Sequence, residues 1–121
     1  MPLARDLRGF SAGQALALGG SVNTGISTAG STLGTATALT ASVNLIGTNS
    51  AATQGVSLND MNVGESQEVY NGTATSCLVY PPTSSDQINQ IAAGSAMILP
   101  QYTAVVIKRM TTTRFVAYMS S

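Results

Sequence analysis

The side chains that could carry out chemistry are few, and their spacing does not assemble a catalytic group. The chain has five acidic residues and no histidine, so an imidazole base and a histidine metal ligand are both excluded. Glu65 and Glu68 are three positions apart in a predicted strand and face opposite sides, whereas paired-carboxylate catalysis needs both in one cleft. No serine or threonine lies in a nucleophile-elbow pattern. The sequence therefore predicts that the protein is not an enzyme.

The single cysteine, Cys77, has an equally plain interpretation. One cysteine cannot form a disulfide within the chain or a thiolate metal cluster. Cys77 lies in an apolar run and has no histidine base, so we expect an inert, buried thiol. Neither a cofactor site nor a metal site is predicted.

Charge is scarce along the whole chain. Of its 121 residues, 8% are charged and the net charge is zero, whereas about 25% are charged in an average globular domain. Five basic residues are balanced by five acidic ones, which leaves no basic patch for nucleic acid. A free monomer with so few charges is poorly protected from association, so the composition predicts a surface covered by partners. The alternative is a neutral, hydroxyl-rich β domain that is soluble by itself.

The sequence contains no pattern typical of a membrane span or a secretory signal. Its apolar runs fall far short of the roughly 20 residues that cross a bilayer. Residues 1–10 carry Arg5, Asp6 and Arg8 and lack an apolar central region. We therefore expect a single domain, the default for this length, made and kept in a cytoplasm without a membrane partner.

The first residues differ in pattern from the rest of the chain. Leu3, Leu7 and Phe10 are spaced by four and three positions, which is a weak helical stripe. Arg5 and Arg8 lie off that stripe. A segment this short is marginal as a helix in water. It is interpreted either as an arm that becomes ordered on a partner or as a frayed terminus.

The composition changes again after this stripe. Residues 19–40 are rich in Gly, Ser and Thr, which is typical of a flexible linker, but their sparse apolar residues also fit an extended segment packed against a neighbour. From residue 39 to 45, apolar residues recur at every second position, which predicts a half-buried strand. We therefore divide the chain into an extended arm with a low-complexity segment, residues 1–40, and a β module, residues 41–121.

Five apolar runs predict strands in the second half of the chain. The runs cover residues 69–70, 77–80, 96–99, 103–107 and 115–119. They are rich in β-branched and aromatic residues, and Gly, Pro or Asn interrupts the sequence between them. This pattern predicts an all-β fold, a small antiparallel sandwich or barrel of jelly-roll-like form. Its last two strands are expected to form a hairpin that turns at residues 111–113.

One short helix is expected between these strands. Ser84 and Gln87 have the spacing of a capping box. Ile88 and Ile91 would then lie on one apolar face over a single turn, and Gly94 would end the helix. We expect this helix to plug one end of the sandwich.

The alternation of side chains between the two faces of each predicted strand indicates which residues form the core. The predicted core residues are Leu78, Tyr80, Val105, Ile107 and Phe115. On their strand, Leu78 and Tyr80 share one side, opposite to Cys77 and Val79. On the last strand, Ala117 and Met119 share the side of Phe115 and are expected in the core as well.

The strand at residues 103–107 predicts an oligomer. Val105, Val106 and Ile107 make it apolar on both faces, and a strand apolar on both sides is buried on both sides. A single small sandwich leaves one face in water, so a second subunit would supply the cover. Closed cyclic symmetry is then expected, and we predict a homotrimer.

The order of these segments resembles small proteins on the capsid surface of tailed bacteriophages. The pattern consists of Val69-Tyr70-Asn71-Gly72, Leu78-Val79-Tyr80-Pro81-Pro82, Asp86-Gln87-Ile88-Asn89 and Thr103-Ala104-Val105-Val106, with an aromatic residue in the last strand. Over residues 55–119, this order is similar to head decoration (cement) proteins and to the base of head fibres. The resemblance implies a trimeric, β-rich knob without catalytic activity, bound to the major capsid protein of a virion that is assembled in the host cytoplasm.

These observations predict a structural virion protein that binds the outer surface of a phage head as an oligomer and stabilises the lattice. The candidate docking residues are Leu3, Arg5, Leu7, Arg8 and Phe10. Apolar anchors flanked by cations suit an interface, because the anchors fill pockets and the cations pair at the rim.

The alternative is a head-fibre or tail-associated module that binds a carbohydrate or receptor on the host surface. Tyr70, Tyr80, Tyr102 and Tyr118 are the rings that could form a sugar platform. Tyrosines at strand ends more often pack with the hydroxyl at the surface. Aromatic residues clustered on exposed loops would favour the binding module.

Overall fold

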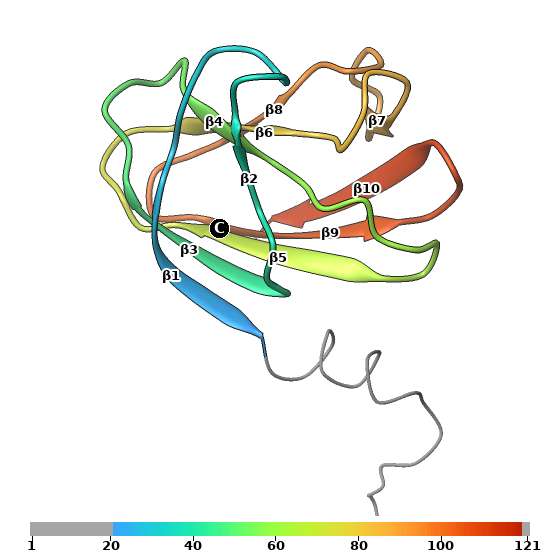
Figure 1. The fold of residues 1–121 in the computed structure, drawn as a ribbon, viewed down its shortest axis with the longest axis horizontal. Coiled ribbons are helices and arrows are strands. Elements are labelled where there is room, and N and C mark those ends of the chain that lie inside the picture. Colours follow the sequence, from blue (N-terminus) through green and yellow to red (C-terminus); the bar gives the residue numbers. More distant parts are fainter. Residues whose placement is uncertain (1–20, 120–121) are drawn as a thin grey trace, which may run out of the picture.

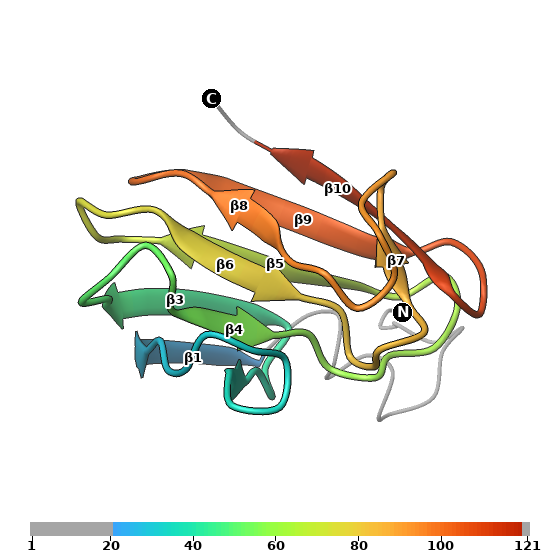
Figure 2. The same ribbon diagram turned by 90° about the horizontal axis from the view of Figure 1, so that it is seen from above.

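The structure, a computed structural model, describes residues 21–119, which form ten strands and no helix (Figure 1). Sheet A has six strands, in the spatial order β1 (Val22–Ser27), β3 (Val43–Thr48), β5 (Ser66–Asn71), β9 (Ala104–Arg109), β10 (Arg114–Met119) and β7 (Gln87–Ile88). Sheet B has four strands, in the order β2 (Thr37–Ala38), β4 (Gly55–Ser57), β6 (Cys77–Tyr80) and β8 (Met97–Leu99). Figure 2 shows the strands of sheet B lying over those of sheet A. The predicted all-β class is confirmed.

The first six strands alternate between the two sheets, so the chain winds through three successive coils. Strands β1, β3 and β5 pair in parallel in sheet A, and β2, β4 and β6 pair in parallel in sheet B. Parallel neighbours need a long crossover, and here each crossover includes a strand of the opposite sheet. This mixed arrangement differs from the antiparallel one predicted, because residue alternation reports which face is buried and not the direction of the neighbouring strand.

The first coil is formed by residues that the sequence places in the low-complexity segment. Strand β1 pairs with β3, and β2 pairs with β4. Ile26 and Leu39 are buried and belong to the core cluster. Sparse apolar residues among Gly, Ser and Thr are therefore enough to anchor a coil in this fold.

The remaining strands close the stack of coils. Strand β8 pairs antiparallel with β6, and β9 pairs antiparallel with β5. Strands β9 and β10 form the predicted hairpin, with residues 111–113 in its turn. The two-residue strand β7 pairs in parallel with β10. Both sheets therefore combine parallel and antiparallel pairs.

The short helix predicted for residues 84–92 is not formed. The segment makes turns on either side of β7. The backbone N–H of Gln87 donates to the Thr113 carbonyl at 2.8 Å, and the backbone N–H of Asn89 donates to the Phe115 carbonyl at 2.8 Å. Both residues are therefore bound to sheet A by backbone hydrogen bonds. Asn89 has a φ of +54°, which is outside the helical range. A capping-box spacing and one apolar turn are too short a helix signal to outweigh these bonds to the sheet.

The core lies between the two sheets. Val105, Ile107 and Phe115 are fully buried in it. Tyr80 is buried outside the central cluster, where its hydroxyl donates to the Ser31 carbonyl at 2.9 Å. Leu78 is half-buried and also lies outside the cluster.

Leu78 and Met119 differ from the predicted core, whereas Tyr80 is buried as predicted. In β6, Cys77 and Val79 belong to the central cluster, so alternation turns Leu78 and Tyr80 to the other side of sheet B. Both pairs are apolar, and the local sequence cannot choose between them. In β10, Met119 is 54% exposed, because the narrower sheet B leaves the end of this strand uncovered (Figure 2).

Candidate functional site

The side of sheet A that faces away from sheet B is a broad candidate surface. Successive residues of a strand point to opposite sides of the sheet. Because Asn44, Val69, Val105 and Phe115 are buried towards sheet B, the residues next to them in each strand point away from sheet B. We call this surface the outer face. It comprises Val22, Val43, Leu45, Ser66, Glu68, Tyr70, Ala104, Val106, Lys108, Arg114, Val116 and Tyr118.

The outer face is largely apolar. One row of residues in register crosses five strands and consists of Val22, Val43, Glu68, Val106 and Tyr118. Tyr70 and Val106 are each 37% exposed, and Tyr118 is 56% exposed. Exposed apolar side chains that are contiguous mark an interaction site, whereas scattered ones do not.

Three charged residues interrupt the outer face. Arg114 Nη2 donates to Gln87 Oε1 at 3.1 Å. Glu68 and Lys108 lie on the neighbouring strands β5 and β9, in diagonal positions, because Glu68 is directly opposite Val106. Within the part of the chain that the structure describes, neither Glu68 nor Lys108 forms an ion pair.

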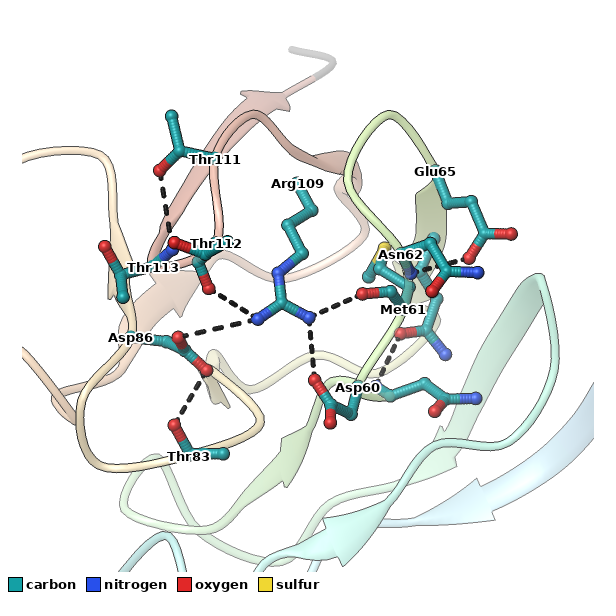
Figure 3. A network of polar contacts seen from close by, with 12 residues as sticks. Asp60, Met61, Asn62, Glu65, Thr83, Asp86, Arg109, Thr111, Thr112 and Thr113 are labelled. Atoms are coloured by element: carbon teal, nitrogen blue, oxygen red, sulfur yellow. Dashed lines mark hydrogen bonds and ion pairs between the residues drawn. The ribbon is translucent and has the colours of Figure 1, made fainter.

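A polar cluster surrounds Arg109, which lies near the β9–β10 turn (Figure 3). Arg109 Nη1 donates to Asp60 Oδ1 at 2.7 Å and to the Met61 carbonyl at 2.5 Å, and Nη2 donates to the Thr112 carbonyl at 2.5 Å. Nη2 also lies 3.9 Å from Asp86 Oδ1. One guanidinium therefore joins the β4–β5 loop, the β9–β10 turn and the segment before β7.

The contacts of this cluster indicate a role in holding the fold together. Asp86 is 2% exposed, and its Oδ2 accepts a hydrogen bond from Thr83 Oγ1 at 2.8 Å. The Arg109 guanidinium lies over the Phe115 ring, 5.1 Å from the centroid, where the ring face attracts the cation. The carboxylates are thus held by protein groups, and the cluster fastens loops to the core instead of presenting a reactive group.

A shallow cavity of about 190 Å³ opens next to Asp60 and Met61. It is lined by Ser21, Thr40, Ala41, Ser42, Asn59, Asp60, Met61, Asn62, Glu65, Ser66 and Gln67. The buried Gln67 amide is satisfied by the backbone, since Oε1 accepts from Asn59 N at 2.9 Å and Nε2 donates to the Ala41 carbonyl at 2.8 Å. The cavity offers hydrogen bonds, and residues 21–119 contain no cluster of three His, Cys, Asp or Glu that could hold a metal.

Cys77 is fully buried in the core. Burial raises the pKa of its thiol from 9.0 to about 11, because the thiolate would lose its hydration. The thiol is therefore protonated at neutral pH and is a poor nucleophile.

The residues predicted for binding fall in different places. The candidate docking residues Leu3, Arg5, Leu7, Arg8 and Phe10 lie outside the described residues. Of the four tyrosines, Tyr70 and Tyr118 share the outer face, Tyr102 is 60% exposed in a loop, and Tyr80 is buried. The structure thus brings two of the predicted platform rings to one surface and separates the others.

The sequence predicts that a second face of the strand at residues 103–107 is covered, but neither the extent of the outer face nor the Arg109 cluster. A signal for the outer face exists in β5, where Ser66, Glu68 and Tyr70 alternate with the buried Gln67 and Val69. The Arg109 cluster has no local signal, because Asp60 is 49 positions away in the chain.

Comparison with known proteins identifies no relative. No family model, no curated protein and no solved structure matches the chain. Residues 21–119 contain no helix, and therefore none of the length and hydropathy needed to cross a membrane.

Proposed function

We propose that this protein is a structural component of a tailed-phage virion, a decoration or cement protein that binds the outside of the head as a homotrimer and stabilises the lattice. The observation that carries the proposal is the apolar outer face, which an isolated chain would leave in water. The resemblance of residues 55–119 to phage head proteins supports it. The two stacked sheets would serve as a compact, sandwich-like knob on the major capsid protein.

The N-terminal segment supplies the contact with the capsid in this proposal. Leu3, Leu7 and Phe10 provide apolar anchors for pockets. Arg5 and Arg8 are two of only five cations in the chain, and they would pair at the rim. A trimer presents three such segments, so individually weak contacts combine through avidity.

Sedimentation with empty heads tests this function. The heads are assembled from the major capsid protein encoded in the same genome. The full chain is expected to sediment with them, and the chain without residues 2–20 is expected to stay in the supernatant with its oligomeric mass unchanged. Decoration by the truncated chain would move the docking site to the β module. Absence of binding by the full chain would overturn the proposal.

A head-fibre or tail-associated module that binds a host-surface glycan is the second candidate. It is favoured by the exposure of Tyr70, Tyr102 and Tyr118, because aromatic rings present an apolar body and a polar tip. Titration with purified host polysaccharide, followed by tyrosine fluorescence, tests it. A saturable signal that Tyr118→Ala abolishes, from a protein that does not bind heads, would select this candidate.

A further inference from the structure

Two opposite charges stand in the middle of the outer face. Glu68 on β5 and Lys108 on β9 are both exposed, and neither has an ion-pair partner within residues 21–119. On the same face, Glu68 lies in register with Val43 and Val106, and Lys108 lies in register with Ser66 and Val116. An acid and a base set in an apolar surface make that surface complementary to a copy of itself.

We propose that the outer face is the subunit interface of this protein: the outer faces of three copies meet around a three-fold axis, with Glu68 of one copy beside Lys108 of the next. In a closed ring of three copies, each chain gives its acid to one neighbour and its base to the other. The inference concerns the oligomer alone. It stands even if the protein binds no capsid.

Such packing accounts for the residue pattern of β9. Sheets that pack face to face lie about 10 Å apart with interdigitated side chains. Val105 and Ile107 are already covered by sheet B, whereas Val106 is 37% exposed on the outer face. A second copy would cover Val106 and leave β9 buried on both sides, which is the environment in which strands are apolar on both faces.

A second copy fits this surface better than a sugar does. Sugar and ligand sites combine an apolar wall with several convergent polar groups. Next to Tyr118, the outer face offers Val106 and Val116, which cannot bind a hydroxyl group. A copy of the same chain needs only the pair of charges, because its own apolar residues fill the rest of the contact.

Charge reversal tests the contact, with light-scattering mass at tens of micromolar as the readout. The wild-type chain is expected to give the mass of three chains of 12.3 kDa. Glu68→Lys and Lys108→Glu are each expected to weaken association at least about tenfold, because like charges then face each other across the interface. Both positions are exposed, so folding is retained. Gln90→Lys, exposed in the loop after β7, is the control and should keep the wild-type mass.

Recombining the charges distinguishes a contact between copies from a contact within one chain. The double variant with Glu68→Lys and Lys108→Glu is expected to recover the wild-type mass. An equimolar mixture of the two single variants is expected to associate more strongly than either variant alone, because two of the three contacts in a mixed ring join a chain with two lysines to a chain with two acids. A pair formed within one chain cannot be rescued by mixing.

Three results would overturn the proposal: a monomeric wild-type chain, single variants that keep the wild-type mass, or a mixture that stays monomeric. Because every measurement is made without heads, these outcomes are independent of capsid binding. Failure to sediment with heads, conversely, would leave the interface unaffected.

Discussion

Arg109 joins three loops through one guanidinium, and its two acidic partners differ greatly in exposure. The Asp60 side chain is 69% exposed and that of Asp86 is 3% exposed. Arg109→Ala leaves Asp86 buried without its cation, so the free energy of unfolding should fall by about 3 kcal/mol. Asp60→Asn removes an exposed partner and should cost about 0–1 kcal/mol. Urea unfolding of both variants checks this difference, and equal losses would contradict it.

Phe115 and Leu78 test the assignment of the core. Phe115 is fully buried, so Phe115→Ala is expected to cost about 3–5 kcal/mol, a large part of the roughly 5–15 kcal/mol that stabilises an ordinary domain. Leu78 is half-buried outside the cluster, so Leu78→Ala should cost less than about 2 kcal/mol. Thermal melting of the two variants ranks them. A loss of about 2–5 kcal/mol for Leu78→Ala would restore the strand phase predicted from the sequence for β6.

The buried thiol gives the protein a pH-dependent stability. Burial raises the pKa of Cys77 from 9.0 to about 11, so the unfolded chain releases the thiol proton at lower pH than the folded chain does. The free energy of unfolding should therefore be unaffected by this group below about pH 9 and fall between about pH 9 and 11. Urea titrations of wild type and Cys77→Ala measure the effect, which should be missing in the variant. Identical pH profiles would contradict the assignment.

At the scale of elements, the coils are in close contact where β4 passes β6. A Cβ at Gly55 would lie 2.5 Å from the Leu78 carbonyl oxygen, a backbone atom that cannot rotate away. Gly55→Ala is therefore expected to cost about 1–3 kcal/mol. Gly34→Ala is the matched control, because a Cβ there meets no atom within 4 Å, and its effect should stay within about 0.5 kcal/mol. If both variants melt like the wild type, β4 and β6 are not stacked this closely.

Strand positions could be predicted from local sequence, whereas most strand partners could not. The β9–β10 hairpin was predictable, because two apolar runs flank a turn of three threonines. The parallel partners could not be predicted. Val43 pairs with Val22 and Glu68, which are joined to it by long crossovers, and the residues next to Val43 in the sequence do not indicate these partners. The predicted helix is absent for a related reason: the backbone N–H groups of Gln87 and Asn89 form hydrogen bonds with residues that come much later in the chain.

At the scale of the whole molecule, the described core depends on the coils and the hairpin. Its members run from Ile26 to Phe115. Deleting residues 2–20 is therefore expected to shift the melting temperature by less than about 4 °C, the effect of roughly 1 kcal/mol or less in a domain of this size. Circular dichroism of the full and truncated chains, at equal concentration, measures the shift. A loss well above that value would assign core residues to the deleted segment.

The candidate surface was predictable in kind but not in place. The low charge and the apolar β9 indicated that some face is covered by a partner. Locating that face required the register of five strands, which brings Val22, Val43, Glu68, Val106 and Tyr118 into one row. Residues so distant in the chain become neighbours only through the pairing of coils, which local patterns do not encode.

The winding of the coils also has a consequence for the chain while it is being synthesised. Strands β1 to β6 leave the ribosome first, and the free edges of β5 and β6 are closed only by β9 and β8. Until residues 97–109 have been translated, one edge of β5 and one edge of β6 remain unpaired and can capture another nascent chain. Pairing with the C-terminal strands therefore protects β5 and β6 from aggregation. A ribosome that stalls before these strands would release a fragment that is prone to aggregate.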